Sequence, residues 1–136
     1  MDASYVYNEA TLSSMTRKEI ANEFLRLAAS GNVQEAYDKY VHIDFFHHNP
    51  YFPGDRQSLL KGMEDSAKEM PNKNYRTVQA LEDGDLVAVH GCITLKPEMP
   101  EVALMHILRF EGDKIIEEWE AAQEVPKDMP NNNGMF

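Results

Sequence analysis

The stretch VALMHILRFEGDKIIEEWEAAQ, residues 102–123, holds the clearest structural signal in the chain. Apolar and polar residues alternate on both sides of Gly112-Asp113, a pair typical of the tight turn between two antiparallel strands. We therefore predict a hairpin with strands over residues 102–110 and 114–123. Its titratable, aromatic and amide side chains include His106, Trp119, Glu120 and Gln123.

The residues before this hairpin predict three helices and two further strands. Apolar residues at helical spacing follow capping residues at Thr16 and Asp55, and a short second helix is expected from Asn32. From residue 74 the period becomes that of strands, over 75–81 and 86–95, with a turn at Asp83-Gly84. Helices followed by an antiparallel meander indicate an α+β fold. A long meander curls, and helices across its mouth would enclose a cavity for a small ligand.

Composition limits the classes of partner. The chain has 136 residues and a net charge of −10, which argues against nucleic acid and against anionic membrane surfaces as partners. We expect a single domain over 1–136, with an N-terminal arm at 1–15 and a tail at 124–136. Cys92 is alone, so no intramolecular disulfide can form. Together with an N-terminus unlike a signal peptide, this predicts a cytoplasmic protein.

The register of the hairpin decides which side chains face the cavity. With a regular two-residue turn, His106 lies opposite Trp119. One extra residue bulged into the last strand near Glu117–Glu118 would instead place Glu120 opposite His106, and bulges are common beside active sites. Without the bulge, Glu120 points to water, as Glu117 and Glu118 are expected to do. A carboxylate desolvated in an apolar cavity can exchange protons near neutral pH, so Glu120 is the first candidate acid/base group.

Histidines supply the other candidates. His90 and His106 each lie in an apolar strand, where a single histidine is commonly a core residue bonded to a hydroxyl or carbonyl. Two such histidines near a carboxylate raise the prospect of an acid/base pair. In the aromatic loop 41–55, one of the adjacent His47 and His48 is expected to point inward.

We predict no metal and no organic cofactor. His48, His90, His106 and Glu120 carry suitable ligand atoms, but no pair has the local spacing of a metal motif. The glycines are scattered among turns, so no phosphate-binding loop is present. Cys92 is expected to be a buried core residue, and Arg109 to face away from His106.

Three segments resemble the SnoaL-like proteins of the nuclear-transport-factor-2-like superfamily, whose SnoaL-type members are polyketide cyclases. They are FFHHNPYFPGDRQSLLKGM, HILRFEGDKIIEEWEAAQEVP and NNNGMF, and the resemblance spans residues 16–136. It implies a cone-shaped roll, in which a strongly curved, mainly antiparallel sheet wraps around N-terminal helices and encloses a pocket. It also implies catalysis without a cofactor and a homodimer formed through the sheet.

The resemblance assigns roles to single residues. Glu120 stands where the family has its acid/base aspartate, and His48, Asn49 and Pro50 match a His-Asn-Pro motif of the pocket loop. His90 stands where a strand histidine is frequent. The chain departs from the pattern at Glu118, where the family often has histidine. Trp119 and Gln123 also match residues of the family pattern. His106 stands where many relatives have aspartate.

The leading hypothesis is a cofactor-independent acid/base enzyme, such as an aldol-type cyclase, dehydratase or isomerase, acting on a small apolar carbonyl compound. The predicted catalytic residues are Glu120, His106, His48 and His90. The predicted substrate-binding residues are Asn49, Trp119, Gln123, Phe46 and Tyr51. The alternative is a non-catalytic protein that binds a small ligand in the same pocket, and a third reading is a dimerisation domain with a dry pocket.

Overall fold

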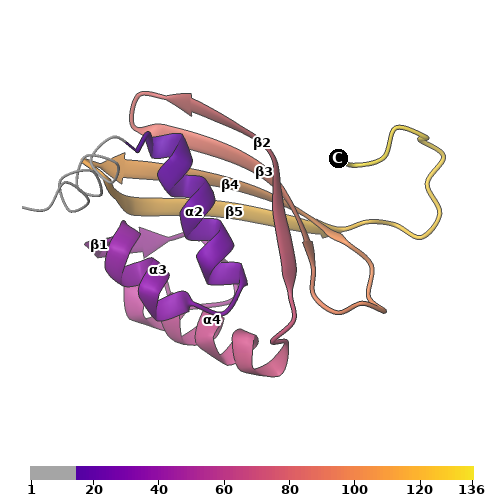
Figure 1. Cartoon of the computed structure of the whole chain (residues 1–136), viewed down its shortest axis with the longest axis horizontal. Coiled ribbons are helices and arrows are strands. Elements are labelled where there is room, and N and C mark those ends of the chain that lie inside the picture. Colours follow the sequence, from indigo (N-terminus) through magenta and orange to yellow (C-terminus); the bar gives the residue numbers. More distant parts are fainter. Residues whose placement is uncertain (1–14) are drawn as a thin grey trace, which may run out of the picture.

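The computed structural model describes residues 15–136, which form three helices and five strands (Figure 1). The predicted arm at 1–15 lies outside the described residues except for Met15. The elements in chain order are α2 (Arg17–Ala29), α3 (Val33–Tyr40), β1 (Val41–His47), α4 (Arg56–Glu69), β2 (Asn74–Asp83), β3 (Leu86–Thr94), β4 (Val102–Glu111) and β5 (Lys114–Glu124). The α+β fold class is confirmed. Among the described residues, no helix is both long and apolar enough to cross a membrane.

The helix starts follow from local capping. The Thr16 hydroxyl accepts a hydrogen bond from the Glu19 backbone N–H, and the Glu19 carboxylate accepts one from the Thr16 N–H, both at 3.1 Å. Asp55 caps α4 by accepting from the Ser58 N–H at 3.0 Å. These bonds satisfy donors that the first helical turn leaves free. The three predicted helices are confirmed.

The sheet has the order β1-β5-β4-β3-β2 and is antiparallel except for the parallel pair β1 and β5. Strand β1 corrects the prediction of one aromatic loop over residues 41–55. Its hydrogen-bonding partner, β5, is distant in the sequence, so no local turn signal announces the pairing. Along β1, the side chains of Phe45 and His47 point inward and that of Phe46 between them points outward, and the loop itself begins at His48.

The helices cover one face of the curved sheet (Figure 1). The guanidinium of Arg17, in the first turn of α2, donates to the carbonyl oxygens of Gly112 at 3.1 Å and Gly84 at 2.9 Å. These carbonyls belong to the two hairpin turns, so α2 is held at the same end of the sheet as both hairpins. Tyr37 of α3 is completely buried in the core between this face and the helices.

The β2–β3 register differs from the predicted one. Asp83 pairs with Leu86, so the turn is Gly84-Asp85, and Gly84 has the positive φ of +60° that such a turn favours. A further shift between residues 77 and 79 leaves Gln79 opposite His90, so the predicted pairing of Thr77 with His90 is wrong.

Candidate active site

A bulge in β5 sets the orientation of the site. Arg109 pairs with Glu117 and Phe110 with Ile115, so Ile116 is the extra residue. The predicted bulge is therefore confirmed, slightly nearer the turn than expected. Beyond it, Glu120 lies opposite His106 and Glu118 opposite Leu108.

The same bulge turns Glu118 inward, which corrects the expectation that it points to water. Glu118 is only 5% exposed, whereas Glu117 lies on the outer face of the sheet between an arginine and a histidine. Because neighbouring strand residues alternate between faces, one extra residue moves both Glu118 and Glu120 to the cavity side.

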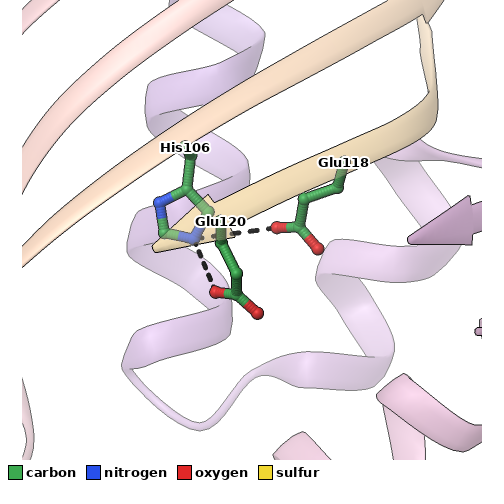
Figure 2. Close-up of side chains that lie close together, drawn as sticks. All are labelled: His106, Glu118 and Glu120. Atoms are coloured by element: carbon green, nitrogen blue, oxygen red, sulfur yellow. Dashed lines mark hydrogen bonds and ion pairs between the residues drawn. The ribbon is translucent and has the colours of Figure 1, made fainter. Parts of the chain in front are cut away.

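His106, Glu118 and Glu120 converge inside the cavity (Figure 2). The Nε2 atom of His106 lies 3.1 Å from Glu120 Oε2 and 3.7 Å from Glu118 Oε1. His106 is 6% exposed, and its Nδ1 atom is buried without a partner in residues 15–136. The carboxyl group of Glu118 accepts no hydrogen bond within that same part of the chain. Among these residues, the site thus holds one carboxylate that accepts hydrogen bonds, Glu120, and one uncommitted carboxyl group that accepts none, Glu118.

The loop after β1 brings an amide to Glu120. The Asn49 side chain donates to Glu120 Oε1, while its own Oδ1 accepts from the Tyr51 backbone N–H at 2.9 Å. The Asn49 backbone N–H donates to His47 Nδ1 at 3.0 Å, so His47 Nε2 carries the hydrogen that it donates to the Pro53 carbonyl at 2.7 Å. Both ring nitrogens of His47 are used to shape the loop, and the Asn49 amide is held in place by it.

The cavity has a volume of about 430 Å³, which suits a small organic molecule. Apolar side chains form most of its wall, among them Phe24, Leu25, Leu59, Met63, Ile93 and Leu104. Gly91 of β3 makes room for one part of this wall, because a Cβ atom there would lie 2.7 Å from the Tyr75 ring. An apolar surrounding strengthens electrostatic interactions among the few polar groups within it.

Burial and mutual contact drive the two carboxyl groups to different pKa values. Burial raises the pKa of Glu118 to about 7, and the Glu120 charge adds to this against the opposing effect of His106. Burial also acts upward on Glu120, but the hydrogen bonds from His106 and Asn49 and the His106 charge outweigh it, so its pKa is lowered. Near neutral pH, Glu120 is ionised and Glu118 is close to half protonated.

The pKa of His106 is raised from its ordinary value. Burial opposes the charged imidazolium, but the hydrogen bond to Glu120 and the charges of Glu118 and Glu120 favour it. A protonated His106 beside an ionised Glu120 is the charge arrangement that this geometry favours.

These three side chains could also hold a cation. Each offers one ligand atom, and the three atoms lie within 4.8 Å of one another. One imidazole and two carboxylates form a donor set that several divalent metals accept. This set shares His106 and Glu120 with the metal ligands considered from the sequence, but replaces His48 and His90 by Glu118.

The structure does not bring His48 and His90 to this cavity. His48 lies on the outer face, where its Nε2 is 2.8 Å from Glu117 Oε2 and its ring stacks on Trp119. His90 also faces outward and bonds through Nε2 to the Met135 carbonyl at 3.0 Å. Of the two adjacent histidines, the buried one is His47, because β1 continues its alternation through Phe45.

The predicted substrate-binding residues divide in the same way. Asn49 and Tyr51 line the cavity, and Tyr51 is 86% exposed, so it lies at the opening. Phe46 packs edge-on against His48 on the outer face, and Trp119 stacks there too. Gln123 is exposed and pairs with Ala103. The catalytic and binding roles themselves stay predictions.

Two further predictions concern residues outside the cavity. Cys92 is 2% exposed, as expected, and donates to Glu101 Oε2 at 3.0 Å. Burial and the Glu101 carboxylate raise the pKa of its thiol to about 11, which suits an inert side chain. Arg109 faces away from His106, as predicted, and donates to Glu117 Oε1 at 2.8 Å.

Sequence reasoning missed Glu118 and Lys73 as cavity residues. The signal for Glu118 was present, since the bulge that turns Glu120 inward must turn the residue two positions earlier inward as well. Lys73 follows a helix end at Pro71 and precedes a strand, so nothing in its surroundings marks it as part of a pocket.

Comparison with known proteins gives matches in structure but not in sequence. No protein-family profile and no curated protein matches the chain. Several of the matching solved structures carry the name "putative polyketide cyclase". The one from Acidithiobacillus ferrooxidans is 22% identical, with a TM-score of 0.67 over 80% of this chain and 89% of that one. The one from Bacillus cereus is 23% identical, with a TM-score of 0.67 over 85% of this chain and 76% of that one.

A third structure is an NTF2-like protein of unknown function from Cytophaga hutchinsonii. It is 17% identical, with a TM-score of 0.64 over 81% of this chain and 92% of that one. At such identities the likeness concerns the fold, and it agrees with the resemblance found in the sequence. The chain therefore has a nuclear-transport-factor-2-like fold, which it shares with these three structures.

Proposed function

We propose that this protein is a cofactor-independent acid/base enzyme of the lyase or isomerase type, acting on a small, largely apolar carbonyl compound. The observation that carries the proposal is the 3.1 Å contact between His106 Nε2 and Glu120 Oε2 in an apolar cavity, beside the uncommitted Glu118 carboxyl. Two carboxyl groups with pKa values driven apart form a natural base and acid.

Glu120 is the proposed base. Its ionised carboxylate takes a proton from the carbon next to the carbonyl, so the C–H bond breaks and its electron pair forms the enolate. His106 and Asn49 each donate to one Glu120 oxygen, which fixes the orientation of the carboxylate. Positioning of this kind is a large part of acid/base catalysis.

Glu118 is the proposed acid. In its neutral form it donates its proton to the carbonyl oxygen as negative charge develops there, which yields an enol. As the carbonyl re-forms, the enol proton returns to Glu118 and the proton held by Glu120 goes to one of three acceptors. Its transfer to the far carbon of a conjugated double bond gives isomerisation, its transfer to a departing β-hydroxyl gives dehydration with release of water, and its transfer to the oxygen of a second carbonyl attacked by the enol carbon gives aldol cyclisation. All three outcomes begin with the same proton abstraction, so that step is the one to test.

Deuterium exchange tests it without knowledge of the natural substrate. Octan-2-one is incubated with the protein in D2O, and loss of its α-hydrogens is followed by NMR. We expect wild type to accelerate exchange and Glu120→Gln to lose at least about 100-fold of that acceleration. Glu117→Gln, which changes the neighbouring outward carboxylate, should exchange at the wild-type rate.

Exchange by Glu120→Gln as fast as by wild type, or no acceleration by wild type, would contradict the proposal. The protein would then be better described as a non-catalytic binder of small apolar molecules, the alternative hypothesis.

We also propose that two copies pair through the outer face of the sheet. The support is a set of exposed apolar side chains on β4 and β1: Met105 is 57% exposed, Ile107 44% and Phe46 41%. Sedimentation velocity should give a dimer for wild type and a monomer for Ile107→Glu. Lys61→Glu on α4 should remain dimeric, and a monomeric wild type would contradict the pairing.

A further inference from the structure

Lys73 places a cation in the wall of the cavity. It lies between α4 and β2, is half-buried, and lines the cavity together with Ser66, Met70 and Tyr75. Its ammonium group donates to the Ser66 hydroxyl. Within residues 15–136, no carboxylate lies close enough to form a salt bridge with it, and its remaining N–H donors have no partner.

Such a lysine is unusual in its energetics. Burial lowers the pKa of Lys73, with a smaller opposing effect from Glu69, so part of the hydration of the ammonium has been lost. A desolvated cation with one neutral hydrogen-bond partner is incompletely compensated. Glu69 offsets this charge only in part, and no carboxylate of the described residues forms a salt bridge with Lys73. An anionic group of a ligand would do so.

The position of Lys73 defines a second polar end of the cavity. Tyr75 pairs with Ile93, which pairs with Val102, whereas His106 lies four positions further along β4. That is roughly 13 Å of extended strand. The apolar side chains of Ile93, Leu95 and Leu104 line the wall between the two ends.

We propose that the cavity binds an amphipathic carboxylate, an oxo acid with an alkyl or alkenyl body, whose anionic group pairs with Lys73 and Ser66. The apolar body lies along the β3–β4 wall, and the carbonyl reaches Glu118 and Glu120. The reverse orientation would bring a carboxylate against two acidic side chains, so the charges of the cavity select one direction. This inference deepens the proposed function for the carbonyl end, whereas the anion subsite stands independently of it.

The test compares two ligands that differ in charge. Binding of octanoate and of octan-1-ol to the full chain is measured by isothermal titration calorimetry at pH 7. Wild type should bind octanoate at least about tenfold more tightly than octan-1-ol, because the ammonium adds a charge-assisted hydrogen bond. Lys73→Met should remove that preference and leave octan-1-ol affinity within about twofold of wild type.

Controls separate the subsite from general effects. Lys68→Met removes an exposed lysine near the end of α4, outside the cavity lining, and should behave as wild type. Lys73→Gln keeps a polar side chain of similar length and should lose the preference as Lys73→Met does, which provides a second test if the methionine variant folds poorly.

Equal affinity of wild type for the two ligands, or no saturable binding of octanoate, would overturn the proposal. An equal loss of affinity for both ligands in the two Lys73 variants would overturn it as well. Glu120→Gln should retain the octanoate preference while it loses deuterium exchange. Failure of the proposed reaction and failure of the anion subsite are therefore seen in different measurements.

Discussion

Strand β5 presents a glutamate on each of its faces that contacts a histidine from another segment, His106 of β4 or His48 after β1, and the two pairs differ in what surrounds them. On the inner face, His106 meets Glu120 at 3.1 Å, with side chains 7% and 22% exposed. On the outer face, His48 meets Glu117 at 2.8 Å, with side chains 45% and 12% exposed. The distances alone would favour the outer pair as the stronger interaction.

The residues around each pair point the other way and make the inner pair the better candidate for catalysis. The outer Glu117 also accepts from Arg109. Partial burial acts against its charge, but the bonds from His48 and Arg109 outweigh it and lower its pKa. The inner pair has a second carboxyl, Glu118, beside it and an apolar wall around it. Contact between an imidazole and a carboxylate is therefore not enough to indicate chemistry. A third ionisable group beside the pair, within an apolar cavity, is the more informative feature.

The sharpest separation should come from the two histidines. His106→Gln should slow the exchange of octan-2-one by about 10²-fold or more, because Glu120 loses the imidazolium charge that holds it ionised. His48→Gln should leave the rate within about twofold. NMR exchange rates at saturating ketone provide the measurement. Equal losses in both variants would mean that the outer histidine, a catalytic candidate from the sequence, acts on the reaction after all.

The pH dependence should depend on the inner acid. Glu118 must be protonated to donate, and burial raises its pKa to about 7. Exchange should therefore fall about 50-fold from pH 7 to pH 9, as a single ionisation requires. Glu118→Gln should be slower throughout but should lack this alkaline decline. A decline of the same size in that variant would assign it to another group.

Stability should also depend on the inner acid. A carboxyl whose pKa is raised on folding favours the folded state below its unfolded pKa of 4.5, and that contribution is lost as pH rises through about 7. Relative to wild type, Glu118→Gln should therefore gain about 2 to 3 kcal/mol of stability between pH 5 and pH 8. Urea denaturation at the two pH values measures this, and the absence of such a gain would contradict it.

The smallest effect is expected at the outer pair. His48→Ala removes a partly exposed ion pair and a stacked ring, which together should contribute less than about 1 kcal/mol to stability. The loss should shrink further in high salt, since exposed charges are screened. Thermal or urea denaturation at two salt concentrations would detect a larger contribution, which would show that the outer face is more strongly coupled to the core than its exposure suggests.

Much of the fold follows from local signals. Thr16 with Glu19 and Asp55 with Ser58 are caps that a short window of sequence contains, and Gly112-Asp113 is a turn of the same kind. Strand β1 was missed because its pairing with β5 depends on residues about seventy positions away. The residues that follow it, from His48 onward, are polar and include prolines, so they obscure the strand alternation by which Phe45 and His47 face inward.

The site could be predicted from the sequence only on the condition that β5 contains a bulge. His106 and Glu120 meet because Ile116 is an extra residue, and three carboxylates around Trp119 fit either register about equally well. Glu118 and His48 were placed on the wrong faces for the same physical reason, which is that adjacent strand residues point in opposite directions. Lys73 lines the cavity because of how α4 packs against the sheet. The spacing of apolar residues in the sequence does not reveal that packing.

The extra residue at Ile116 also bears on how such a site could arise or disappear. Removing Ile116 itself would leave every later residue of β5 opposite the same partner, so Glu120 would still lie opposite His106. Pairing all residues of β5 without a bulge would instead turn Glu117 and Trp119 to the cavity and Glu118 and Glu120 to the solvent. Every side chain of the site would still be encoded. In this fold, a shift of one residue in the register of β5 can therefore be a greater chemical change than any single substitution. Relatives that encode the same side chains but lack the bulge would seem in an alignment to share a site that they do not have.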